Sequence, residues 1–301
     1  PNYRGRGPAS VTYFVDGLPY VPLGPDSLGV DPSYFSLSQF ERMEVEKLPG
    51  SLRVSLFSPR HFSKAPGSRI GITSGDKNVA RYIGALEYRF PVGIGFSVGG
   101  ERMVAPTATG TSSDFDITNG RLALDFVPSH RFGMEAQFVT STPDRKAFVD
   151  VDTLELALKG RRNDAHFRVF WRNRPDDLGL RVDGLLGLTT WKGQGVDDEV
   201  RQGGVVAAWR TRTFGLTARA FNRSRTTPLD FSAEVGWSPL GIFSAAVEAA
   251  YQTHDLDRES RWVGARAGLS LPFGLQLTGS GRAGRLVATP ALLNTGAQDL
   301  T

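Results

Sequence analysis

Three short motifs in this chain match sequences that do chemistry in enzymes. Residues 95–99 (GFSVG) match the nucleophile elbow, and residues 279–284 (GSGRAG) match the dinucleotide-binding fingerprint. Both motifs need a helix after them, but both lie inside segments whose polarity alternates as in a strand. Residues 74–77 (SGDK) match a Ser-x-x-Lys acylation motif but fit a hairpin turn better. We therefore predict no catalytic residue, no cofactor and no enzymatic activity.

The residues that usually bind metals are scattered or missing. There is no cysteine, and the four histidines, at 61, 130, 166 and 254, lack metal-ligand spacing. Carboxylate pairs at 176–177, 197–198 and 255/257 fall in predicted loops, where solvated charge is a better explanation than weak Ca²⁺ binding. The net charge of +4 is spread along the chain, and the lone RGRG at residues 4–7 lacks aromatic platforms. We predict neither a metal site nor a nucleic-acid partner.

Composition restricts how this chain could meet a membrane. Apolar residues make up 40% of the sequence and there are 35 glycines, yet no stretch approaches the ~20 apolar residues of a spanning helix. A closed barrel needs apolar residues only on its outer face, so this polarity permits one. The sequence begins at Pro1 without a recognisable export signal, which we interpret as a mature or truncated product.

From Gly67 onward, apolar and polar residues alternate in segments of about ten residues, as in strands with two different faces. For example, Leu122, Leu124 and Phe126 lie on the opposite face from Arg121 and Asp125. The same period recurs to about residue 286. The pattern predicts an all-β fold, an antiparallel transmembrane β-barrel of about fourteen strands.

The predicted connections alternate between tight and longer ones. The tight ones are 91–93, 128–131, 160–164, 212–215, 239–241 and 272–274, and the longer ones are 104–118, 141–150, 224–228 and 253–260. Outer-membrane barrels have this asymmetry, with short periplasmic turns and long external loops. If residues 180–191 were one full strand, the later tight connections would fall on the outer side. We therefore interpret them as part of a long loop or as two short strands.

Alternation alone does not establish which face is wet. A soluble β-sandwich binding module has the same period with its apolar face inward. Mixed charges on the polar face suit an aqueous lumen, and tryptophans near segment ends suit a lipid interface, although each single tryptophan fits a core equally well. If Leu122, Phe138, Leu156 and Trp237 were buried together, the barrel interpretation would fail.

Three motifs in order near the start resemble the second half of a TonB-dependent receptor plug. They are residues 3–7 (YRGRG), 11–20 (VTYFVDGLPY) and 37–51 (LSQFERMEVEKLPGS). The resemblance implies a partial plug at 1–66, a barrel at 67–286 and a tail or further strand at 287–301. It also implies the outer membrane of a Gram-negative-type bacterium, surrounding lipid, and uptake of a scarce solute of the ferric siderophore, vitamin or oligosaccharide class.

The resemblance assigns roles to particular residues. The plug-motif residues, which we expect to maintain the fold, are Arg4, Gly5, Asp16, Gly17, Glu41, Arg42, Glu44, Pro49 and Gly50. Asp16 and Gly17 fit a tight turn after a buried strand, and Glu41, Arg42 and Glu44 could pair with lumen charges. By position in the family, the solute would contact Tyr20, Asp26, Asp31 and Tyr34 and the loops near 107–115 and 144–148.

The sequence also departs from the family pattern. Lys47-Leu48 stands where the family has Arg-Gly, and the stretch that closes the plug is absent after Ser51. The segment that binds the periplasmic TonB protein is not present, so that partner depends on a region outside this sequence. Fourteen strands are also fewer than the family's twenty-two. A passive or structural outer-membrane barrel without active transport therefore stays open as an alternative.

Overall fold

The computed structural model describes most of the chain and contains two β-sheets. It describes residues 11–287 except 25–29, 31–33, 49–50, 61–62, 76–78, 106–113, 150–153, 177, 226, 240–241, 255–256 and 272–274, and also residues 299–300. A four-stranded inner sheet is followed by one long antiparallel sheet, here called the wall. The all-β prediction is confirmed. Among the described residues, no helix is long and apolar enough to cross a membrane.

The inner sheet has the strand order β2-β1-β4-β3. Its strands are β1 (Val11–Val15), β2 (Leu18–Pro19), β3 (Arg42–Leu48) and β4 (Ser51–Phe57), and the short helix η4 (Leu37–Gln39) precedes β3. β1 runs parallel to β4, while β3 pairs with β4 as an antiparallel hairpin. Val11, Val15, Val54 and Leu56 form its buried apolar cluster.

Asp16 and Gly17 make the turn from β1 to β2. Their φ angles are +51° and +90°, which are left-handed values that aspartate tolerates and glycine adopts without strain. The turn is fixed by two further hydrogen bonds. The Asp16 amide donates to the Leu56 carbonyl at 2.9 Å, and its carboxylate accepts from the Ser58 amide at 3.0 Å. The turn thus ties β1 to the end of β4.

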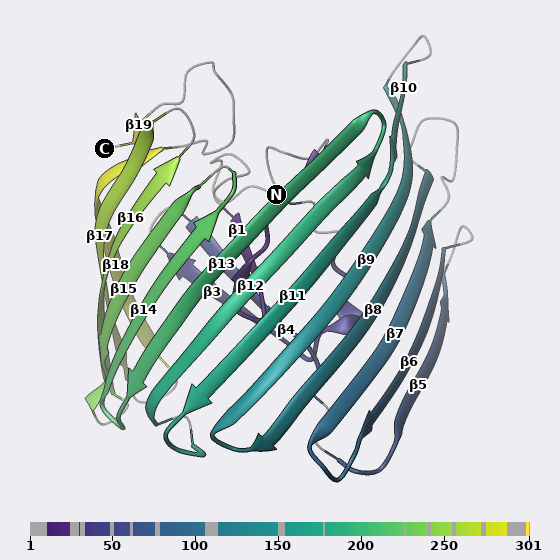
Figure 1. Ribbon diagram of the computed structural model, residues 1–301. Helices are drawn as coiled ribbons and strands as arrows, with labels where there is room; N and C mark the ends of the chain where they lie inside the picture. The colour runs from purple at the N-terminus through teal and green to yellow at the C-terminus, as the bar shows by residue number, and fades with distance from the viewer. Residues whose placement is uncertain are drawn as a thin grey trace.

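The wall runs from β5 to β19, and each neighbouring pair along it is antiparallel (Figure 1). Its strands are β5 (Gly67–Ser74), β6 (Ala80–Arg89), β7 (Ile94–Ala105), β8 (Asp114–Ser129), β9 (Phe132–Val149), β10 (Leu154–Lys159), β11 (Arg161–Arg172), β12 (Gly179–Gly193), β13 (Val196–Arg210), β14 (Phe214–Arg223), β15 (Leu229–Trp237), β16 (Phe243–His254), β17 (Arg258–Ser270), β18 (Gln276–Val287) and β19 (Asp299–Leu300).

Two expected connections are wrong, and one register explains both errors. β10 and β11 both pair with β9: Lys159 lies opposite Asp144, and three residues further on Arg162 lies opposite Ser141. The two are therefore one continuous partner of β9, interrupted only at Gly160, and no turn lies at 160–164. Without a turn at 160–164, the later tight connections fall at the same end of the wall as the earlier ones. Residues 180–191 consequently belong to a single strand, β12, instead of a loop or two short strands.

Other expected loops are shorter than the sequence indicated. Residues 141–149 are the far half of β9, where we had expected a loop. β7 and β8 extend into the 104–118 segment from both sides, and β16 and β17 extend into 253–260. The strands thus continue well past the end of clear alternation, because backbone pairing does not depend on which side chains are apolar.

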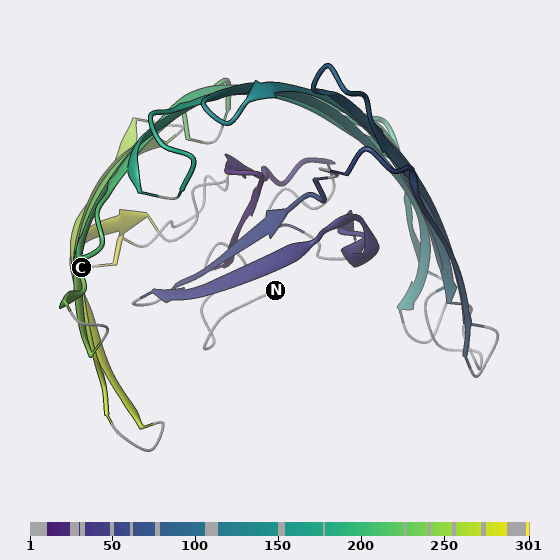
Figure 2. The same cartoon turned by 90° about the horizontal axis from the view of Figure 1, so that it is seen from below.

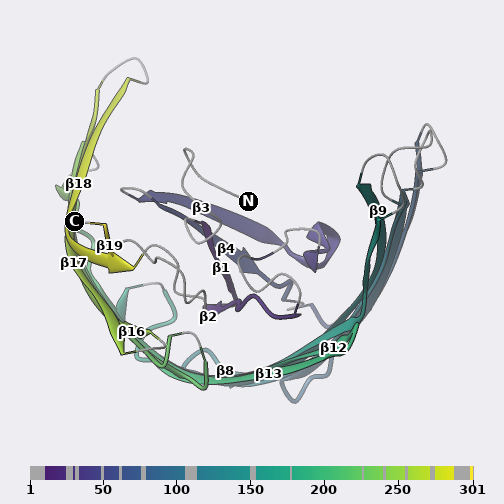
Figure 3. The ribbon, with the colours of Figure 1, turned by 90° about the horizontal axis from the view of Figure 1, so that it is seen from above.

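The wall curves around the inner sheet. Viewed along its strands, it is an open arc with β1 to β4 on its concave side (Figures 2 and 3). Within the described residues, β5 pairs only with β6, so the arc does not close on itself. The concave side and the inner sheet therefore form the surface where function should be sought.

Candidate functional site

The convex side of the wall is apolar and the concave side is charged. Leu122, Phe138 and Trp237 expose 46%, 45% and 49% of their surface, whereas Arg121 and Arg168 expose only 8% and 6%. This is the reverse of a soluble sandwich, in which those apolar residues would share a dry centre. The sandwich alternative is therefore wrong. The side chain of Leu156 lies outside the described residues.

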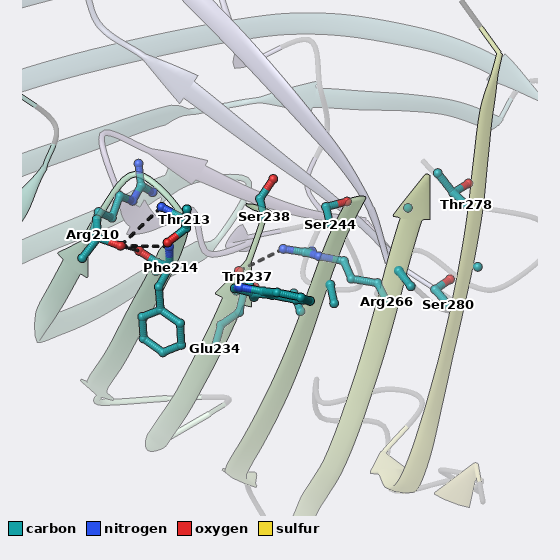
Figure 4. A pocket seen from close by; sticks show the side chains of 18 of the residues that line it. Arg210, Thr213, Phe214, Glu234, Trp237, Ser238, Ser244, Arg266, Thr278 and Ser280 are labelled. Carbon is teal, nitrogen blue, oxygen red and sulfur yellow. Dashed lines mark hydrogen bonds and ion pairs between the residues drawn. The ribbon is translucent and has the colours of Figure 1, made fainter. Parts of the chain in front are cut away.

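A chain of five alternating charges joins the inner sheet to the wall. Glu46 of β3 pairs with Arg53 of β4 at 2.9 Å and with Arg266 of β17. Arg53 extends the chain to Glu248 of β16 at 3.2 Å, and Arg266 extends it to Glu234 of β15 at 2.9 Å (Figure 4). Each inner-sheet charge thus contacts a wall charge of opposite sign, which fixes where the β3–β4 hairpin sits.

This ionic chain changes the titration of Glu46. Burial raises the pKa of its carboxyl, but the guanidinium groups of Arg53 and Arg266 lower it by more, so the pKa lies below its ordinary value. Glu46 is therefore ionised at neutral pH, and the contact is a true ion-pair network. Because its members are partly wet, each single pair contributes modestly to stability.

A second contact centres on Arg162 of β11, which is 1% exposed. Its guanidinium forms a bidentate pair with Asp164 at 2.8 and 2.9 Å and donates to the Val21 carbonyl at 2.8 Å. It also stacks on the Tyr20 ring, 3.8 Å from the centroid. Thr189 donates to Oδ1 of Asp164 at 2.8 Å, the oxygen that also accepts from Nη2 of Arg162. One wall arginine thus holds both the backbone and the aromatic ring of the segment after β2.

An apolar patch surrounds that contact and is shared by both sheets. It contains Val21, Leu23 and Tyr34 from the inner segment and Ile117, Trp191 and Val200 from the wall. Trp191 is fully buried, and a Cβ on Gly24 would lie 2.7 Å from its ring. Two features therefore require glycine at position 24: this close approach to the Trp191 ring and the left-handed φ of +71°.

This patch defines where two of the residues we assigned to solute binding lie. Tyr34 is 5% exposed, and Tyr20 packs against the same cluster beneath Arg162. Burial raises the pKa of the Tyr20 phenol, so the ring remains neutral. Asp26 and Asp31 lie outside the described residues. A solute role for this set stays a prediction, and in the present arrangement both tyrosines contact the wall.

The helix η4 and the residue before it make a third contact. Ser36 donates to the Glu101 carboxylate of β7 at 2.5 Å, and Ser38 donates to the same carboxylate. Arg81 of β6 pairs with Glu101 at 2.9 Å, while Arg69 of β5 donates to the Ser38 carbonyl. The inner segment is thus attached to the first wall strands as well as to the later ones.

The other predicted plug-motif residues do not make the wall contacts we expected. Arg42 pairs with Glu44 at 3.4 Å and lies over the Phe57 ring, and both charged side chains are exposed. Glu41 is exposed as well. The wall contact belongs to Glu46 and Arg53, which the motif did not single out. Arg4, Gly5, Pro49 and Gly50 lie outside the described residues.

The enzyme-like motifs lie on strands. Residues 95–99 are inside β7, residues 279–284 are inside β18, and Ser74 is the last residue of β5. Asp76 and Lys77 are not described. Among the residues that are described, no group of three or more His, Asp or Glu side chains could hold a metal ion.

The curved wall with an inner sheet on its concave side is the fold of TonB-dependent receptors. Two solved structures show the likeness. The copper transporter OprC superposes with a TM-score of 0.65 at 11% identity, covering 91% of this chain and 57% of that one. The ferric enterobactin receptor PfeA of Pseudomonas aeruginosa superposes with a TM-score of 0.66 at 13% identity, covering 92% and 55%.

The chain thus spans about half the length of the solved structures that it matches. No protein-family model matches the sequence, and no curated protein matches it either. At this identity the likeness establishes the fold and leaves the solute to be determined.

Proposed function

We propose that this chain is the plug-containing part of an outer-membrane, TonB-dependent receptor-like transporter. In this proposal residues 1–66 are part of the plug, 67–286 are barrel wall and 287–301 lead into a further strand or tail. The observation that carries the proposal is the polarity of the wall. Large exposed apolar residues recur on its strands from Ile70 to Leu277, while Arg121, Arg162 and Arg168 are buried on the concave side, where the inner sheet lies.

The chemistry of the interface supports a displaceable plug. Most of the wall contacts described above are ion pairs and hydrogen bonds to hydroxyls or carbonyls, for example Gln202 donating to the Pro19 carbonyl at 2.8 Å. Water can replace such contacts at modest cost, because displaced polar groups regain hydrogen bonds to solvent. The apolar patch around Trp191 would oppose release, so we infer that the plug moves only when it is pulled.

For the solute, we propose a scarce compound of the ferric siderophore, vitamin or oligosaccharide class. OprC and PfeA are a copper transporter and a ferric enterobactin receptor, and no described residue of this chain distinguishes among these classes. The solute would enter from the end of the wall opposite the short connections, which in such barrels faces the outside. The pulling partner would be the periplasmic TonB protein.

Two experiments test the proposal. Membrane fractionation of producing cells should place the protein in the outer-membrane fraction, and unheated samples should migrate faster in gels than boiled ones. Growth with a candidate solute as the sole source of iron, vitamin or carbon should then require both this protein and TonB. Outer-membrane location with growth that does not depend on TonB would favour a passive or structural barrel. Recovery as a detergent-free soluble protein would refute both.

A further inference from the structure

A hollow of ≈ 1130 Å³ lies between strand β3 and the last wall strands, at the end of the short connections (Figure 4). Val45 and Lys47 line it from the inner sheet. The wall side is formed by the ends of β13 to β18 and by the β13–β14 turn, residues 211–213. The hollow therefore lies at the opposite end of the wall from the long β9–β10 hairpin.

The hollow exists because the wall has small side chains there. Glycine occupies positions 215, 236 and 268, and Ala246 continues the series on β16. A Cβ on Gly236 would meet only two backbone oxygens, at 4.0 Å. Elsewhere on the concave side, large groups such as Arg162 and Trp191 fill the corresponding space. Six serine and threonine residues complete the polar lining, at 211, 213, 238, 244, 278 and 280.

The charge of this hollow is unbalanced. Arg266 and Glu234 in its lining pair with each other at 2.9 Å and are part of the ionic chain. Three further cations line it, Lys47, Arg210 and Arg212. Within the described residues, none of these three forms an ion pair with a carboxylate. A space of this size with three surplus positive charges and several hydroxyl donors has the composition of an anion site.

We propose that this hollow binds a phosphate group, held by Lys47 of the inner sheet and by Arg210 and Arg212 of the wall. A phosphate has enough oxygens to accept from several cations and hydroxyls at once, and its charge of nearly two matches the surplus better than one carboxylate does. The group could belong to soluble phosphate or to a lipid headgroup at the membrane surface. The proposal concerns binding alone and holds whether or not the protein transports a solute.

Because Lys47 comes from the inner sheet and the arginines from the wall, an occupied site would connect the two sheets. Bound phosphate should therefore make the plug harder to displace. This consequence distinguishes the proposed site from a general attraction of anions to a basic surface, which would leave the docking of the inner sheet unchanged.

Equilibrium dialysis of the protein in a non-ionic detergent against radiolabelled inorganic phosphate tests the proposal. We expect saturable binding that weakens about tenfold or more in the Lys47→Gln/Arg212→Gln double variant. Lys192→Gln is the matched control, since Lys192 is an exposed cation that pairs with Asp197 away from the hollow. Equal binding by the wild type and the double variant, or no binding by the wild type, would overturn the proposal.

A second variant removes the space without changing charge. Gly236→Leu should abolish phosphate binding. Gly84→Leu should not, because Gly84 lies on β6, far from the hollow, and a Cβ there would meet nothing within 4 Å. Gel migration of unheated samples verifies that each variant folds. Unchanged binding in a folded Gly236→Leu variant would contradict the site. Short-chain phosphatidylglycerol identifies the natural source: displacement of phosphate points to headgroups, and failure to displace it points to soluble phosphate.

Discussion

Replacing Arg162 by methionine should loosen the inner sheet more than any other single change in its polar contacts. The substitution keeps an apolar stem over Tyr20 but leaves the Asp164 carboxylate, bonded otherwise to Thr189, as a buried charge without its cation. Removing one partner of a buried pair costs about 3–5 kcal/mol. The Val21 carbonyl also loses its donor.

Native-state hydrogen exchange of the β1 amides measures this loss. These amides pair within the inner sheet, whose buried cluster of four residues is too small to hold that pairing once the wall contacts are lost, so we expect undocking to expose them. A change of about 3–5 kcal/mol corresponds to roughly 100- to 4000-fold faster exchange. Arg161→Met is the matched control, because Arg161 is the exposed neighbour on the same strand and should change docking by less than about 0.5 kcal/mol.

The sign of a double variant separates this reasoning from a simple loss of packing. If the stranded charge carries most of the cost, Arg162→Met/Asp164→Asn should exchange more slowly than Arg162→Met alone, because a neutral amide is cheaper to bury than a carboxylate. If the double variant exchanges as fast or faster, or if the single variant matches Arg161→Met, the account of this contact is refuted.

Three further perturbations test other parts of the structure. The pKa of Glu46 is lowered in the docked state, so the ionised carboxylate stabilises docking fully above pH 4.5, its ordinary pKa. This stabilisation is lost as the pH falls through the lowered pKa, and Glu46→Gln should abolish that acid dependence of docking. The urea midpoint for plug release, read by a fluorophore on Thr12→Cys, measures it. Leu122→Arg should cost about 2–4 kcal/mol of folding into vesicles, seen as a smaller fraction of fast-migrating protein. Alanine at Gly93 or Gly195 should lower the free energy of unfolding of the barrel in urea by about 1–2 kcal/mol, because both positions have a left-handed backbone. The loss should be larger at Gly93.

Each of these has its own control. Arg42→Gln, an exposed charge on the same strand as Glu46, should leave the acid dependence of docking intact. Thr213→Arg in the β13–β14 turn should insert normally, and equal insertion by Leu122→Arg would contradict an outward lipid face. At Gly93 a new Cβ would lie 2.8 Å from the Val127 carbonyl, whereas at Gly195 it meets nothing within 4 Å. Equal losses at the two glycines would show that this clash has no effect.

The strands and their faces could be predicted because alternation is a local property. The period-2 pattern around Leu122 indicated a two-faced strand, and the Asp16-Gly17 pair indicated the turn that the structure contains. Locality also caused the main error. Gly160 resembles a turn residue in sequence, but continued pairing with β9 carries the chain straight through it.

The contacts between the two sheets could not be predicted in the same way. Glu46 and Arg266 are 220 residues apart, and their pairing depends on the curvature of the wall and on the register of every strand between them. The motif indicated Glu41, Arg42 and Glu44 as residues that contact the wall. Glu46 lies on the same face of β3 as Glu44, so the sequence alone gives no reason to choose between them. Likewise, nothing local shows that Tyr20 lies beneath Arg162, since the two meet only after the inner sheet is seated.

The most direct test of the central claim uses the absence of cysteine, which lets a single introduced cysteine carry one spin label. Labels are placed one by one at residues 121–126 of β8 in protein reconstituted into lipid vesicles. Their collision rates with oxygen, which dissolves in lipid, and with a water-soluble nickel chelate should both alternate with a period of two, in opposite phase. Oxygen should reach the labels at the Leu122, Leu124 and Phe126 positions more readily. If the nickel chelate reaches those three positions as readily as it reaches 121, 123 and 125, the apolar face does not contact lipid and the account is wrong.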